Sequence, residues 1–213
     1  QAAAAGIDDE GQANGGAWGD FDGDGWADLA VFRFSPRTDA LLYRNQGDGT
    51  FGLEQGRWNQ APQRSLGGIF IDYDGDGDLD IYSVHLQLPN ALYRNDGGRF
   101  SRLTMPDSIA RPQVSLGAAF ADFDDDAALD ILVVNRLAQG NRILARFYRP
   151  GFSDISTAFS ALRGGRDSFS ALPFDYDGDG DLDLHVANRG APDLLHRNDG
   201  GGVYQPVAAD LGV

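Results

Sequence analysis

The sequence contains the segment Asp72-Tyr73-Asp74-Gly75-Asp76-Gly77-Asp78-Leu79-Asp80 in four versions, and this repetition predicts the fold. The other three are DFDGDGWAD at 20–28, DFDDDAALD at 122–130 and DYDGDGDLD at 175–183. Carboxylates at positions 1, 3, 5 and 9 of so short a loop repel one another strongly unless they share a cation. Glycine at position 6 permits the sharp turn that brings them together, since glycine adopts a positive φ at little cost.

Hard oxygen ligands on a glycine-bent loop fit calcium, which takes six to eight oxygens at about 2.3–2.6 Å. We predict a side-chain oxygen from positions 1, 3 and 5, a backbone carbonyl from position 7, and one or both carboxylate oxygens from position 9. Four loops of this kind predict three or four calcium ions. The predicted metal ligands are Asp20, Asp22, Asp24, Trp26 and Asp28; Asp72, Asp74, Asp76, Asp78 and Asp80; Asp122, Asp124, Asp126, Ala128 and Asp130; and Asp175, Asp177, Asp179, Asp181 and Asp183.

The flanks of each loop predict β-strands. An EF-hand loop begins in a similar way, but it closes with Glu at position 12 and lies between two helices. Here the closing acid comes at position 9, and short apolar runs flank each loop, as at 69–71 and 81–84 around the second. Apolar runs around a tight polar loop predict a β-hairpin. A solvated Asp/Gly turn is the alternative for one copy, and four copies in register argue against it.

The repeat is longer than the loop. The loops begin 50 to 53 residues apart, which is close to the length of one four-stranded propeller blade. In three of the units a third apolar run ends in Arg-Asn, at 42–45, 92–95 and 195–198, and a glycine turn follows it. A fourth run then starts at Phe51, Phe100 or Val203. With no sustained helical periodicity, the predicted fold class is all-β.

These motifs resemble the FG-GAP/VCBS repeat family, which includes the calcium-binding blades of integrin α-subunit propellers and many secreted bacterial proteins. The resemblance covers nearly the whole chain. It implies a β-propeller in which calcium lies in the hairpin between the first two strands of each blade. Family members commonly have seven blades, whereas 213 residues suffice for four of this size.

We therefore predict a single β-propeller domain of four repeats, at about 1–52, 53–101, 102–153 and 154–213, each a blade of four antiparallel strands. Segments 4–7 and 210–213 lie at the same phase of the repeat, so we expect a whole number of units. An open array leaves two sheet faces uncovered, which favours a ring closed within one chain. An eight-bladed ring of two chains and a fragment of a larger propeller are the alternatives, so the predicted state is monomer or homodimer.

The composition limits the partners. The net charge is −15, and 19 of the 30 aspartates lie in the four loops. This acidity argues against nucleic acid or an anionic membrane as a partner. No apolar run approaches the 18 residues of a membrane span, so no membrane insertion is expected. Weak calcium sites fill without regulation where calcium is near millimolar, which predicts an extracellular or periplasmic location, although no export signal is visible.

The third repeat departs from the others. Asp125 and Ala127 replace the glycines at loop positions 4 and 6. Alanine at a positive φ costs on the order of 1 kcal/mol, so this metal site should be weaker or empty. The repeat also lacks the LYRN sequence, which indicates either structural drift or a partner site of arginine and aromatic side chains. Those side chains are Arg142, Arg146, Phe147, Tyr148 and Arg149.

Two classes of function fit these features. One is a binding module that recognises a glycan or a protein through loops on one face. The other is a secreted carbohydrate-active enzyme, for example a polysaccharide lyase, with its site at the channel mouth. No Ser-His-Asp order, phosphate loop or zinc motif is present, which favours binding. Clustered exposed tryptophans would favour a glycan, but Trp18 is expected to be buried.

The ends of the second strands are a further candidate surface. Arg33, His85, Asn135 and Asn188 occupy the same position in the four repeats, just after the second apolar run. We expect these side chains to lie at a rim or channel mouth and to line a shared surface there.

Overall fold

The structure, a computed structural model, describes residues 5–7, 13–35, 40–58, 64–105, 113–136, 142–145, 153–154 and 167–207. The chain divides into two compact units, Gln1–Met105 and Pro106–Val213, so each unit holds two of the repeats. Segment 146–149, with its arginine and aromatic residues, lies outside the described residues. Within the described ranges no helix is long and apolar enough to cross a bilayer.

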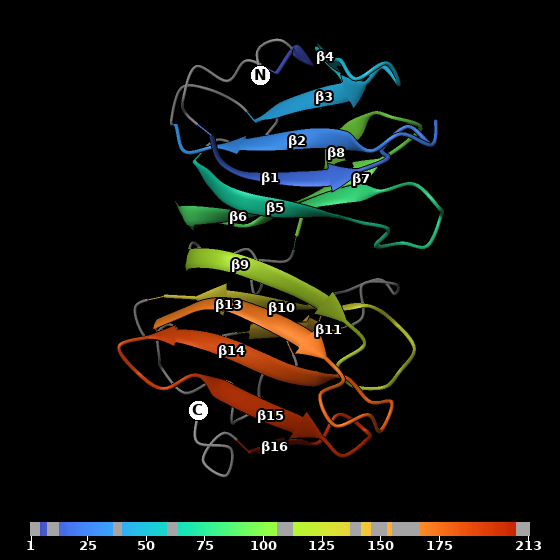
Figure 1. The fold of residues 1–213 in the computed structure, drawn as a ribbon. Coiled ribbons are helices and arrows are strands. Elements are labelled where there is room, and N and C mark those ends of the chain that lie inside the picture. Colours follow the sequence, from blue (N-terminus) through green and yellow to red (C-terminus); the bar gives the residue numbers. More distant parts are fainter. Residues whose placement is uncertain are drawn as a thin grey trace. The chain divides into compact units, whose positions relative to one another are not determined.

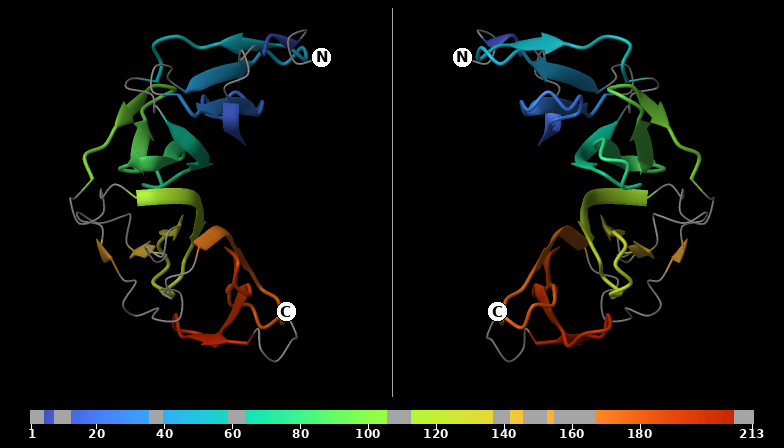
Figure 2. Two further views of the ribbon diagram at one scale, coloured as in Figure 1. Left: turned by 90° about the vertical axis from the view of Figure 1, so that its left-hand side faces the viewer. Right: turned by 90° about the vertical axis from the view of Figure 1, so that its right-hand side faces the viewer.

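The first unit consists of antiparallel strands that pair in chain order within each repeat (Figures 1 and 2). The first repeat contains β1 (Ala13–Gly19), β2 (Asp28–Arg33), β3 (Leu41–Asn45) and β4 (Phe51–Leu53). The second repeat contains β5 (Ser65–Ile71), β6 (Asp80–Leu88), β7 (Ala91–Asn95) and β8 (Phe100–Arg102). The predicted strand order of the repeat is confirmed here, with the LYRN sequence in the third strand and Phe51 or Phe100 at the start of the fourth.

The second unit repeats this arrangement. Its strands also pair antiparallel, each with the next along the chain within its repeat. The third repeat contains β9 (Gln113–Ala121), β10 (Asp130–Asn135), β11 (Arg142–Ala145) and β12 (Ser153–Asp154). The fourth contains β13 (Asp167–Phe174), β14 (Asp183–Arg189), β15 (Leu194–Asn198) and β16 (Tyr204–Pro206). The described part of the chain is therefore all-β and antiparallel, as predicted.

Each aspartate-rich loop joins the first two strands of its repeat. The last residue of the first strand pairs with the closing aspartate, which is the first residue of the second strand. These pairs are Gly19 with Asp28, Ile71 with Asp80, Ala121 with Asp130 and Phe174 with Asp183. The hairpin register thus fixes the two ends of every loop in the same way.

The second strands lie deepest in both units. Every residue of β10 is buried, as are all but the last residue of β2 and the first six of β6. Such strands carry apolar side chains on both faces because each face is covered, which is the expected pattern for a strand between packed layers. The aspartate that starts each second strand is consequently carried into the interior with it.

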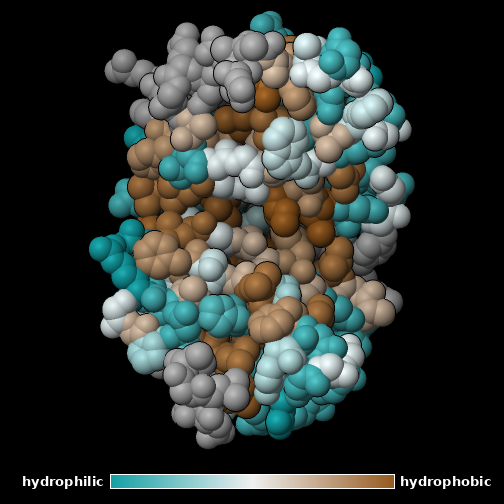
Figure 3. Space-filling model, viewed as in Figure 1, coloured by the Kyte–Doolittle hydropathy of each residue, from teal (hydrophilic) through white to brown (hydrophobic). Residues whose placement is uncertain are grey.

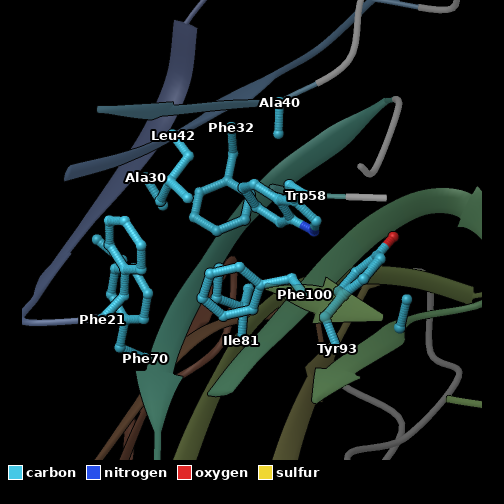
Figure 4. Close-up of a cluster of buried hydrophobic side chains, with 12 residues drawn as sticks. Phe21, Ala30, Phe32, Ala40, Leu42, Trp58, Phe70, Ile81, Tyr93 and Phe100 are labelled. Carbon is cyan, nitrogen blue, oxygen red and sulfur yellow. The ribbon is translucent and has the colours of Figure 1, made fainter. Parts of the chain in front are cut away.

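An aromatic cluster joins the two sheets of the first unit (Figure 4). Phe32 on β2 and Tyr93 on β7 both meet the Trp58 ring edge-on, at centroid distances of 5.9 and 5.5 Å. Phe100 on β8 packs against Trp58 and against Phe21 of the first loop, each at 5.9 Å. Phe21, the aromatic residue at position 2 of the first loop, is therefore a core residue, and it anchors this loop to the second sheet.

Glycine is required where β5 approaches β2. A Cβ atom on Gly68 would lie 2.3 Å from the Phe32 ring and 2.6 Å from the carbonyl oxygen of Tyr82. Because backbone cannot yield as a flexible side chain does, Gly68 is what permits Phe32 to enter the aromatic cluster. The second unit has a smaller apolar cluster of Ala119, Ala121, Phe123, Leu132, Leu184, Val186 and Tyr204.

The expectation that Trp18 is buried is wrong, since 60% of the side chain is exposed. Side chains alternate along a strand, so Ala17 faces the aromatic cluster and Trp18 faces the other way. There its ring meets Phe51 edge-on at 5.8 Å. Apolar side chains are also exposed on the first strands of other repeats, with Ile69 on β5 and Leu172 on β13, and Figure 3 shows apolar surface over β1, β5 and β13.

Two of the four second-strand ends do not lie at the open rim that the sequence suggested, whereas Arg33 and Asn188 are half-buried. His85 and Asn135 are buried, and Asn135 Oδ1 accepts a hydrogen bond from Ser115 Oγ at 2.9 Å. His85 Nε2 lies 2.7 Å from Ser83 Oγ. In these two repeats a register shift in the first hairpin places a serine of the first strand, Ser65 or Ser115, opposite this position.

Candidate metal centres

Three carboxylates meet in every loop, at positions 1, 3 and 9. One oxygen from each lies within 4.8 Å of the others. The four clusters are Asp20, Asp22 and Asp28; Asp72, Asp74 and Asp80; Asp122, Asp124 and Asp130; and Asp175, Asp177 and Asp183. Twelve of the predicted ligands are thus brought together in four equivalent groups of three, including the group in the third repeat.

The aspartate at position 1 holds the loop backbone in its curve. In the first loop, Asp20 Oδ1 accepts a hydrogen bond from the amide of Asp24 at 3.0 Å, and Oδ2 accepts one from Gly25 at 2.8 Å. In the third loop, Asp122 accepts the corresponding bonds from Asp126 and Ala127 at 3.0 and 2.8 Å. These bonds wrap the loop around one carboxylate and turn the following carboxylates toward it.

The closing aspartate is the buried member of each cluster. Asp80 accepts hydrogen bonds from the amides of Tyr73 at 3.0 Å and Asn95 at 2.7 Å, and Asp28 is held in the same way by Phe21 and Asn45. Burial raises the pKa of Asp28 to about 6 and that of Asp80 to about 7, although the backbone hydrogen bonds lower both. A nearby cation would favour the charged form of these carboxyls.

Position 5 has a different local role. Asp24 Oδ1 accepts the amide of Trp26 at 3.0 Å, and Asp76, Asp126 and Asp179 each accept the amide of position 7 in the same way. These carboxylates are not among the three that meet in each cluster. The ligand roles of positions 5 and 7 therefore stay predictions.

The donor set fits a hard divalent cation. Asp22 Oδ1 and Asp74 Oδ1 are buried and accept no hydrogen bond, although each belongs to a cluster. A buried carboxylate oxygen without a donor is costly unless a charge or ligand satisfies it. The other oxygen of Asp22 lies 2.6 Å from Arg44 Nε, so the arginine covers one side of the carboxylate and leaves Oδ1 for an ion.

The loop backbone takes positive φ angles at positions 4 and 6, which explains the glycines there. Gly75 and Gly77 have φ of 70° and 95°. In the third loop Asp125 and Ala127 adopt 58° and 61°, so the same turn is made by residues with a Cβ atom. The positive φ predicted at position 6 is confirmed, and in the third loop Ala127 adopts it at the cost of strain.

Exchanging alanine and glycine at position 6 should shift stability in opposite directions. We expect Ala127→Gly to raise the free energy of unfolding by about 1 kcal/mol, because it relieves a left-handed alanine. Gly77→Ala should lower it by a similar amount through φ alone, since a Cβ atom at Gly77 meets nothing within 4 Å. Denaturant unfolding of both variants in EDTA measures this, and changes of the same sign would contradict it.

The buried Asp80 should make the metal-free protein sensitive to pH. Its folded pKa of about 7 exceeds the usual carboxyl value, so the folded state holds a proton that the unfolded state releases. The contribution of Asp80 to stability is therefore highest below about pH 4 and is lost as pH rises to about 7. In EDTA, the melting temperature of Asp80→Asn relative to that of the unmodified protein should therefore increase as pH rises from about 4 to about 7. A constant difference would contradict the assignment.

The sequence reading missed the asparagine that ends the third strand. Asn45, Asn95 and Asn198 each donate their backbone amide to the closing aspartate of their own loop, at 2.8, 2.7 and 2.8 Å. Their recurrence in the LYRN or LHRN sequence was the available signal. These residues hold the buried carboxylate in place, so they support the candidate metal centre through their backbone amides.

The repeats of this chain are similar in sequence to those of known proteins. No curated protein matches the chain. A solved structure that it resembles is that of the V. cholerae biofilm matrix protein Bap1, with 21% identity and a TM-score of 0.45 over 91% of this chain. The chain spans 30% of the length of that protein. The sequence model of the FG-GAP-like repeat matches residues 20–83 and 72–133, which together make up more than half of the chain. The chain belongs to the FG-GAP-like repeat family.

Proposed function

We propose that this chain is a calcium-stabilised binding module that recognises a glycan through exposed tryptophans of its first repeat. The observation that carries the calcium assignment is the recurrence of one cluster of three carboxylates in all four hairpins, with a buried oxygen left unsatisfied in the first two. Calcium prefers such oxygen donors. Bound ions would offset the repulsion among the carboxylates and fix each hairpin.

The ions would be held by positions 1, 3 and 9 of each loop, with positions 5 and 7 as further donors. The first, second and fourth loops should bind more tightly than the third, because Ala127 strains the third loop. Calorimetric titration of the unmodified protein and of Ala127→Gly with calcium tests this ranking. The substitution should raise the calcium affinity of the third site. A third site that is already the tightest before the substitution would contradict it.

The proposed architecture is a ring of four blades closed within one chain. It is supported by the four repeats, whose strands pair antiparallel in chain order, and by second strands that are apolar on both faces. Sedimentation in calcium tests this closure. A monomer near 22.9 kDa supports the closed ring, whereas an obligate dimer supports the eight-bladed alternative.

The glycan assignment rests on two exposed indole rings. Trp18 and Trp26 are 60% and 52% exposed, and both belong to the first repeat. The indole ring of Trp26 packs closely against Gly47, since a Cβ atom added at Gly47 would lie only 3.0 Å from Trp26 Nε1. A rigid, exposed aromatic ring offers large contact area at low entropic cost, with a polar N–H at its edge. An extracellular or periplasmic location, where calcium is abundant, follows from the same proposal.

Binding to a glycan array, followed by affinity measurements on the bound glycans, tests the ligand class. Trp26→Ala or Trp18→Ala should weaken binding about tenfold, the equivalent of ~1.4 kcal/mol. Leu53→Ala is the matched control, because Leu53 is an exposed apolar residue of the same repeat and should change little. If the chain binds no glycan on the array but binds a protein ligand, the glycan assignment is contradicted and the protein-ligand alternative is favoured.

A further inference from the structure

One buried side chain lies between the first two metal centres. Asn95 is fully buried and its side-chain Nδ2 donates to two carbonyl oxygens. One is that of Leu79 in the second loop, at 3.0 Å, and the other is that of Phe21 in the first loop, at 2.7 Å. Its Oδ1 accepts the amide of Gly98 at 2.7 Å. Every polar group of this side chain is thus engaged, and two of its bonds reach different loops.

These contacts complete a hydrogen-bonded path between the two closing carboxylates. Asp28 Oδ2 accepts the amide of Phe21 at 3.0 Å, and the carbonyl of that residue accepts Asn95 Nδ2. The backbone amide of Asn95 then donates to Asp80 Oδ1 at 2.7 Å. The backbone of Phe21 and the residue Asn95 therefore link the buried acid of the first cluster to the buried acid of the second.

The packing around this path fixes the same two elements. Phe21 is buried against Phe100, which follows the glycine turn after Asn95, at a centroid distance of 5.9 Å. A Cβ atom on Gly98 would lie 3.6 Å from both the Phe21 ring and the Cβ of Asp22, so the turn sits directly against the first loop. Ordering of the first loop should therefore also order the glycine turn after Asn95, whose backbone amide holds Asp80. Ordering of this turn should likewise order the first loop.

The first repeat supplies an internal comparison. Asn45 occupies the same position and also holds its own closing acid, Asp28, through its backbone amide. Its Nδ2 donates to Ala27 of its own loop at 3.0 Å, and its Oδ1 accepts the amide of Gly47 at 3.0 Å. The two asparagines therefore match in their local bonds and differ in the bond of Asn95 to Phe21.

We propose that Asn95 is a positioning residue that couples the two metal centres of the first unit, so that an ion in either loop raises the affinity of the other. The inference rests on the proposed calcium binding by these loops. An ion on Asp28 fixes the backbone of Phe21, and Phe21 fixes the side chain of Asn95. The backbone amide of Asn95 in turn fixes Asp80. The second ion then binds a loop that is already ordered, so its binding no longer includes the entropic cost of ordering that loop. Because coupled binding is reciprocal, an ion in the second loop raises the affinity of the first loop by the same factor.

Terbium ion, a hard cation that serves as a luminescent probe for calcium sites, tests the coupling in the full chain. Trp26 lies within the first loop, whereas 72–80 contains no tryptophan. The part of the tryptophan-excited emission that Trp26→Phe removes therefore reports the first site. We expect Asp72→Asn, which removes one carboxylate of the second cluster, to weaken terbium binding at the first site by about fivefold or more.

Asn95→Ala should abolish that dependence, so that Asp72→Asn no longer changes the affinity of the first site. In Asn45→Ala, the matched control, the dependence should persist. Asn95→Ser, whose hydroxyl is too short to reach Phe21, replaces the alanine variant if the latter does not fold. Terbium binding at the first site that is indifferent to Asp72→Asn overturns the coupling, as does coupling that survives the loss of Asn95. Absence of any sensitised emission would instead count against the proposed metal binding itself.

Discussion

In excess EDTA the melting temperature of this protein should fall by more than ~10 °C relative to the calcium-loaded protein. An ion bound by the folded state alone stabilises it by ~2.7 kcal/mol per site at a concentration of 100 Kd. For a chain of this size that corresponds to roughly 5–10 °C for each site. Three or four filled sites therefore make calcium removal the largest single perturbation that we expect.

Add-back experiments give this prediction its control. Calcium should restore the melting temperature in a concentration-dependent manner, whereas magnesium should restore less, since it demands octahedral geometry and retains water. Scanning calorimetry or circular dichroism measures both transitions. A melting curve that is identical with and without chelator would contradict a structural role for the ion.

Phe100→Ala should destabilise the first unit by about 3–5 kcal/mol, the usual cost of removing a buried phenylalanine from a core. The side chain is 1% exposed and packs against Phe21, Trp58 and Phe70 (Figure 4). Its loss would leave a cavity between the two sheets and remove the support of the first metal loop. Denaturant unfolding in calcium measures the change.

Leu53→Ala is the control for this substitution. Leu53 also lies in a fourth strand, but it is 45% exposed, so its truncation should change the free energy of unfolding by less than about 0.5 kcal/mol. We also expect Phe100→Ala to weaken calcium binding at the first loop, because Phe21 would lose its partner ring. Equal effects of the two substitutions would show that the aromatic cluster contributes little to stability.

The sequence was sufficient to predict the hairpins and the meeting of loop positions 1, 3 and 9, because both depend on local chemistry, whereas position 5 does not belong to these clusters. Apolar runs on either side of the loops predicted the strands, and the positive φ of Gly77 and its equivalents follows from the turn itself. The closing aspartate could be placed for the same reason. Its register opposite the last residue of the first strand is fixed by the length of the loop.

The features that could not be predicted from the sequence depend on contacts between repeats. The side chain of Asn95 makes two hydrogen bonds, to the carbonyls of Leu79 and Phe21. The bond to Phe21 joins residues 74 positions apart in the sequence, which no local pattern specifies. Trp18 was misplaced for a related reason. A tryptophan in an apolar run suggests burial, but which face of β1 is covered depends on the neighbouring sheet, and that sheet covers Ala17.

Anomalous scattering from crystals grown in calcium shows whether calcium occupies the carboxylate clusters. We predict peaks between the carboxylates of Asp20, Asp22 and Asp28 and at the equivalent places in the second and fourth loops, with a weaker peak in the third. Diffraction data that show no anomalous peak at any of the four clusters, from crystals saturated with calcium, would contradict this account.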